Sequence, residues 1–181
     1  MNPPVSCPDL ERIGRQALPQ VLESLFGWSA TELPPADRAL GEASGQPLLA
    51  TVQLTGPRAS GVVQVKLPSV FATQAATHLV GGDHAHSAGA TSAADLAGEF
   101  CNMLAGRVAA QLGVQGYPCE LGIPEVVEEP AVGGARLLPS HPQVQRTTAR
   151  QPPRPAHHSR TDWSCQGHQL TLEIRLRCVP A

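Results

Sequence analysis

Residues 92–113 read SAADLAGEFCNMLAGRVAAQLG, and this stretch carries the strongest helix signal in the sequence. Ser92 stands as an N-cap with Asp95 three residues later, which is a capping-box arrangement. Helical periodicity continues to Leu112, and Gly113 is placed to end the helix in a left-handed cap. The sequence therefore predicts a well-defined helix between these two caps.

This predicted helix, from Ala93 to Leu112, separates an apolar arc from a polar side when its residues are turned by about 100° each. The arc collects Leu96, Phe100, Met103, Leu104, Val108 and Leu112. The opposite side carries Asp95, Glu99, Asn102 and Gly106. We therefore expect one side to pack in the core, with Arg107 and Gln111 reaching out past the edge of the arc.

On the N-terminal side, the sequence predicts a helix, a loop, a hairpin and a second helix. An amphipathic stripe indicates the first helix over residues 9–27, and the Pro and Gly content of residues 31–47 indicates a loop. Alternating runs at residues 48–55 and 61–67 predict the two strands of a hairpin. Pro68 is placed at the first turn of the next helix, which a following pair of glycines would end.

On the C-terminal side, residues 117–127 predict a strand that is interrupted at Pro124. Residues 130–160 combine many prolines and arginines with no acidic residue, which predicts a flexible insertion. Strict alternation over residues 170–178 gives the strongest strand signal, and a turn at residues 166–167 connects it to the strand before it. We therefore expect a terminal hairpin that completes the sheet.

This order of elements predicts an α+β fold with a largely antiparallel sheet and helices packed on one face. The length of 181 residues fits a single domain, residues 1–181, that includes the insertion at 130–160. The net charge of −2 gives no general attraction to nucleic acid, and no apolar run approaches the ~20 residues that span a bilayer. We expect neither a nucleic-acid partner nor membrane insertion.

The cysteine and histidine patterns do not indicate a metal site or a disulfide framework. The five cysteines are scattered and odd in number, without a Cys-x-x-Cys pair, which favours a reducing cytoplasm. The run Asp83-His84-Ala85-His86 and the pair His157-His158 each lack a third fixed ligand. The sequence therefore predicts no metal ligands.

The run from Asp95 to Gly106 resembles the signature of the CheX/CheC family of chemotaxis phosphatases, whose central helix carries Glu-x-x-Asn followed by a small residue. In this chain the motif falls on Glu99 and Asn102. The predicted element order is similar to that of the family as well. The resemblance extends to the hairpin at residues 51–65, to Leu121-Gly122-Ile123-Pro124 and to the last strand, residues 167–176.

The resemblance implies a phosphatase that hydrolyses the aspartyl phosphate of a CheY-type response-regulator receiver domain. Asn102 would position the attacking water, and Glu99 would pair with the active-site lysine of the receiver. Asp95 and Gly106 lie on the same predicted face and are expected at the partner-binding surface; Gly106 would allow close approach of the partner backbone. The phosphorylated receiver would hold the Mg²⁺ ion, so the chain needs no cofactor of its own.

The sequence departs from one variant of the family pattern, in which the first helix carries a second Glu-x-x-Asn. The comparable run here is Glu11-Arg12-Ile13-Gly14, with glycine in place of the amide. We therefore expect a single site per chain, as in the CheX-like branch. The alternative is a non-catalytic module that docks a receiver domain or dimerises, and homodimers are common among related domains.

Overall fold

The computed structural model describes residues 8–34, 46–80, 92–129 and 157–178. Its helices are α1 (Leu10–Phe26), α2 (Ser69–Val80) and α3 (Ala93–Val114). Its strands are β1 (Thr31–Glu32), β2 (Pro47–Thr55), β3 (Ala59–Pro68), β4 (Glu120–Leu121), β5 (Glu125–Glu128), β6 (His157–Cys165) and β7 (His168–Cys178). The predicted α+β class is confirmed.

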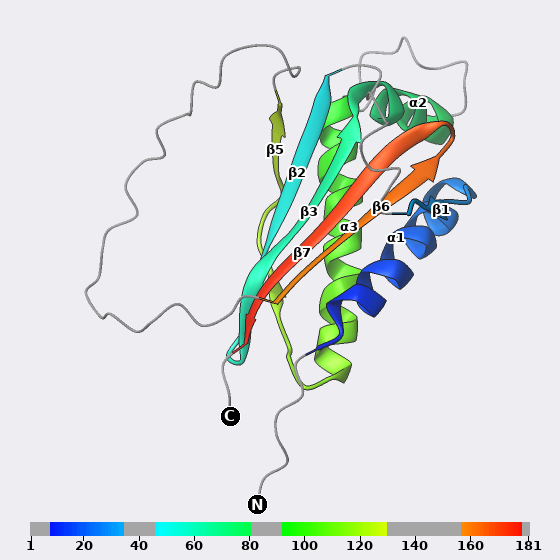
Figure 1. Ribbon diagram of the computed structural model, residues 1–181. Helices are drawn as coiled ribbons and strands as arrows, with labels where there is room; N and C mark the ends of the chain where they lie inside the picture. Colours follow the sequence, from blue (N-terminus) through cyan, green and yellow to red (C-terminus); the bar gives the residue numbers. More distant parts are fainter. Residues whose placement is uncertain (1–7, 35–45, 81–91, 130–156, 179–181) are drawn as a thin grey trace, which may run out of the picture.

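The strands form one seven-stranded sheet in the order β1-β6-β7-β3-β2-β4, and β5 also pairs with β2. All of these pairings are antiparallel. Helices α1 and α3 lie on the same side of the sheet, and α2 covers one end of it (Figure 1). The opposite face of the sheet carries no helix among the described elements, so the predicted packing of helices on one face is confirmed.

Helix α1 begins and ends where its capping residues predict. The Asp9 side chain accepts a hydrogen bond from the backbone N–H of Arg12 at 3.0 Å, and Gly27 ends the helix with a φ of 66°. The helix continues through Pro19. Its buried side chains pack with those of α3 and the sheet, and Phe26 stands 6.3 Å from Phe100 between ring centroids.

Two predictions are wrong in the N-terminal half. Residues 31–32 are not loop, because they form β1 and pair with β6 at the sheet edge. Pro68 does not open the second helix: it is the last residue of β3, opposite Pro47, and α2 starts at Ser69. Proline fits both places, since a strand end does not require its missing N–H.

The predicted hairpins are confirmed, with longer strands than expected. The turn between β2 and β3 is confined to residues 56–58. Between β6 and β7, Gln166 and Gly167 both have positive φ, at 51° and 77°, as a tight two-residue hairpin turn requires. Residues 157–160, which were assigned to the flexible insertion, belong to β6, because alternate side chains there face the core.

The remaining part of that insertion, residues 130–156, lies outside the described residues, as do the glycine pair and the Asp83–His86 run. No helix in the described ranges is long and apolar enough to cross a membrane.

Candidate functional site

The capping box positions the start of α3. The Ser92 side chain accepts from the Asp95 backbone N–H at 3.0 Å, and the Asp95 carboxylate accepts from the Ser92 backbone N–H at 3.2 Å. Ser92 Oγ also donates to Asp95 Oδ2 at 2.7 Å. The carboxylate of Asp95, predicted to lie at a partner surface, is thus exposed but already serves as a helix cap.

The helix does not end at Gly113 as predicted, but continues to Val114 with Gln115 as its C-cap. Gly113 adopts no left-handed conformation, and the carbonyl of Leu112 accepts hydrogen bonds from the backbone N–H groups of Gln115 at 3.0 Å and Tyr117 at 2.9 Å. The difference lies one turn or more beyond the residues of interest, so it does not move them.

The rotation of α3 is set by the side chains that point into the core. Cys101 donates from Sγ to the carbonyl of Ala50 at 3.4 Å, between β2 and β3, and is fully buried. Burial raises the pKa of this thiol to about 12, so it stays protonated and is no nucleophile. Because Cys101 points inward, its neighbour Asn102 is turned toward the outer side of the helix.

Glu99 and Asn102 lie one turn apart on this outer side, as predicted. Glu99 is exposed and Asn102 is half-buried. In the part of the chain that the structure describes, neither side chain has a hydrogen bond or an ion pair. A half-buried amide with unused donors and acceptors, beside an unpaired carboxylate, is available to a partner or to water.

The strand segment that follows α3 runs alongside these residues. A Cβ placed on Gly98 would lie 3.4 Å from Val126 Cγ2 and 3.7 Å from Pro124 Cβ. A Cβ on Gly106, one of the predicted partner-binding positions, would lie 3.9 Å from Leu121 Cδ1. Gly106 is therefore half-covered by the chain's own β4, and a Cβ at this position would make only an ordinary van der Waals contact there.

One member of the predicted apolar arc is misplaced. Met103 is 37% exposed, whereas the other five arc residues are buried. It lies next to Asn102 at the edge of the outer side, so the apolar face of α3 is narrower than the arc that periodicity suggested. Sequence reasoning therefore missed an apolar side chain at the border of the candidate site.

Glu99 and Asn102 lie outside the hollow that the described residues form on the sheet. A hollow of ≈ 680 Å³ lies on the opposite face of the sheet, where its lining includes Thr51, Gln64, Glu125 and Arg175 but neither Glu99 nor Asn102. Glu99 is exposed and Asn102 is half-buried, so a macromolecule that covers this side of α3 can reach both side chains.

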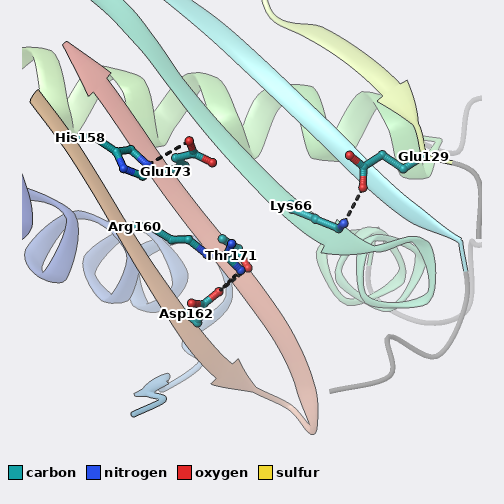
Figure 2. Close-up of polar contacts among 7 residues, drawn as sticks. All are labelled: Lys66, Glu129, His158, Arg160, Asp162, Thr171 and Glu173. Carbon is teal, nitrogen blue, oxygen red and sulfur yellow. Dashed lines mark hydrogen bonds and ion pairs between the residues drawn. The ribbon is translucent and has the colours of Figure 1, made fainter. Parts of the chain in front are cut away.

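Polar groups on that opposite face largely satisfy one another (Figure 2). Lys66 pairs with Glu129, and Arg160 and Thr171 both bond the carboxylate of Asp162. His158 Nε2 lies 3.0 Å from the carboxylate of Glu173, so this side-chain contact links β6 to β7.

The described residues contain no cluster of three or more His, Cys, Asp or Glu that could hold a metal ion. The Asp83–His86 run lies outside the described residues.

Solved structures with the same fold include chemotaxis proteins. The chemotaxis protein CheX of Vibrio vulnificus is 16% identical and has a TM-score of 0.66, with 97% of this chain and 100% of that chain covered. The CheX of Desulfovibrio desulfuricans is 19% identical with a TM-score of 0.64, over 94% of this chain and 100% of that chain. A CheX–CheY–BeF3–Mg²⁺ complex from Borrelia burgdorferi matches at 14% identity and a TM-score of 0.54, over 92% and 96%.

These similarities define the class: the chain has the fold of the CheX/CheC chemotaxis proteins. Residues 48–135 match the family described as chemotaxis phosphatase CheX. This segment includes α3 with Glu99 and Asn102, so the family match covers the part of the chain that carries the candidate site, and the predicted resemblance is confirmed. A comparison with curated protein sequences found no match.

Proposed function

We propose that the chain is a phosphatase that hydrolyses the aspartyl phosphate of a CheY-type receiver domain in the cytoplasm. The observation that carries the proposal is the pair Glu99 and Asn102, which lie one turn apart on the outer side of a capped helix and have no partner among the described residues. Support comes from the family match over the same helix and from the solved neighbour in which a CheX is bound to CheY.

In this proposal the water is held by the carboxamide of Asn102. The amide oxygen accepts a hydrogen bond from the water, which directs the water oxygen toward phosphorus. The bond from the water oxygen to phosphorus forms while the bond from phosphorus to the aspartate oxygen breaks, on the opposite side. The products are inorganic phosphate, which keeps the protons of the water, and a free aspartate carboxylate.

Glu99 docks the receiver rather than acting on phosphorus. Its carboxylate, one turn before Asn102, pairs with the ammonium group of the receiver's active-site lysine and so fixes the amide over the phosphoryl group. The Mg²⁺ ion of the reaction belongs to the receiver. Asn102 does not titrate, so its positioning role needs no particular protonation state.

The direct test measures phosphate release from phosphorylated CheY-type receiver domains in Mg²⁺, with and without the protein. We expect the protein to accelerate release in proportion to its concentration. Tight binding of a phosphorylated receiver with no acceleration would instead support the non-catalytic docking module. Light scattering on the same samples tests the homodimer that the family resemblance implies.

A further inference from the structure

The edge of the sheet changes register beside the candidate site. Leu121 is paired with Leu54, and Glu125 is paired with Thr51. Three residues (122–124) therefore stand on the edge strand where β2 has only two, Val52 and Gln53. One extra residue against a partner strand is a β-bulge, a feature that bends the strand and redirects a side chain.

Sequence and packing explain where the extra residue is accommodated. Gly122 continues the backbone hydrogen bonding with β2, because its N–H donates to the carbonyl of Gln53 at 2.9 Å. A Cβ at this position would lie 3.1 Å from Gln53 Cβ, which is a tight contact. Pro124 has no N–H to pair, which suits an interrupted edge strand. The bulge therefore falls on Ile123 and Pro124.

The bulge lies opposite Asn102. Pro124 and Val126 meet the helix at Gly98, and Leu121 meets it at Gly106. Asn102 is one turn from each of these glycines, so the backbone between Leu121 and Pro124 passes it. Ile123 sits in the middle of that passage and is 85% exposed, although Val126, on the same strand segment, is partly buried against the core.

We propose that Ile123 is an apolar docking residue for the same receiver domain whose aspartyl phosphate Asn102 addresses. This inference rests on the proposed function. A partner that places a phosphoryl group over Asn102 must also cover the bulge beside it. The Glu99 carboxylate, which has no partner within the described ranges, favours a partner with a cation within reach, and Ile123 adds apolar area to that charged contact. The charged Glu99 beside the apolar Ile123 therefore fits the receiver, and a homodimer through Ile123 is an outcome that the test distinguishes.

Val127 provides a matched control. It is an exposed aliphatic residue of the same edge strand, at 59%, and it pairs with Leu49. It lines the hollow on the helix-free face, away from Asn102. Substitutions Ile123→Asp and Val127→Asp therefore introduce the same charge on the same edge segment, and only Val127 lines the hollow on the helix-free face.

The experiment measures the affinity of each variant for a CheY-type receiver domain held in its phosphoryl-like state with BeF3⁻ and Mg²⁺. We expect Ile123→Ala to weaken binding about tenfold, which corresponds to about 1.4 kcal/mol, and Ile123→Asp to weaken it further. Val127→Asp should bind like the wild type. In steady-state dephosphorylation, Ile123→Ala should raise KM by a similar factor and change kcat less than twofold.

Unchanged affinity in both Ile123 variants, beside a wild type that accelerates phosphate release, would overturn the docking role and leave the proposed function standing. Dissociation of a wild-type dimer by Ile123→Asp, with receiver affinity unchanged, would also overturn it. A wild type that neither binds nor dephosphorylates the receiver would overturn both. Melting temperatures of all variants are compared first, and Ile123→Ala serves if Ile123→Asp does not fold.

Discussion

Helices α1 and α3 lie on the same face of the sheet, and both have a side-chain N-cap. They differ at the two positions where the family motif carries Glu and Asn. On α1, Glu11 is paired with Arg15 at 2.8 Å, and Gly14 is buried. On α3, Glu99 and Asn102 are without partners in the described part of the chain.

The difference shows that Glu-x-x-X spacing does not by itself make a site. A Cβ at Gly14 would contact Ile174 at 3.6 Å and Thr161 at 3.7 Å, so this position faces the sheet. An amide there would be enclosed, whereas the amide of Asn102 reaches the surface. The comparison supports one site per chain, and each of the following predictions tests one part of it.

The largest effect is expected at the position where the two helices differ most. Asn102→Ala should lower the assisted dephosphorylation rate by on the order of 10²-fold, the loss expected when one positioning group leaves a preorganised site. Receiver affinity and melting temperature should stay close to wild type, because Glu99 remains and alanine favours the helix.

The control for this variant is Gln16→Ala, which removes an exposed amide from α1. It should leave the rate unchanged. An unchanged rate for Asn102→Ala, beside measurable wild-type activity, would remove this residue from the mechanism, and a large loss of melting temperature would give it a structural role instead.

A smaller effect is expected from matched charge reversals on the two helices. Glu99→Lys should weaken receiver binding about tenfold, since it replaces an attractive contact with a like-charge one. Glu11→Lys makes the same change in net charge but removes only the surface pair with Arg15, so binding should not change. Equal affinities for both variants, measured at low salt, would show that the docking surface is not on α3.

Much of this comparison was accessible from the sequence. Capping residues and periodicity located both helices, and the phase of α3 followed from the apolar residues that it buries. The position of Met103 was missed, because periodicity alone does not show how wide the covered face of a helix is. The bulge at Ile123 was also missed. The sequence shows the interruption at Pro124, but the extra residue appears only in the pairing with β2, which is distant in sequence.

The caps at the two helix starts should contribute similar stability. Ser92→Ala and Asp9→Ala each remove a side chain that accepts a hydrogen bond from a backbone N–H. Each should lower the free energy of unfolding by about 1 kcal/mol. For a chain of this size that lowers the melting temperature by roughly 2–4 °C. Thermal unfolding followed by circular dichroism measures both. A much larger loss for Ser92→Ala would mean that the capping box also positions Glu99, and receiver affinity would then fall as well.

The smallest effect concerns Gly14, the α1 counterpart of Asn102. Gly14→Ala should raise the free energy of unfolding by roughly 0.5–1 kcal/mol, because alanine restricts the unfolded chain and favours the helix. The new methyl group meets only ordinary contacts, at 3.6 Å or more, and φ here is not positive. Gly113→Ala on α3 is the control, since its Cβ would touch nothing within 4 Å and so reports helix propensity alone. Phosphatase activity should not change in either variant.

Gly14→Asn recreates the Glu-x-x-Asn spacing on α1, but it should destabilise the protein by burying an amide and should add no activity. A gain of activity in Gly14→Asn would show that α1 can present a second site, and destabilisation by Gly14→Ala would mean that α1 packs more tightly on β7 than these distances indicate.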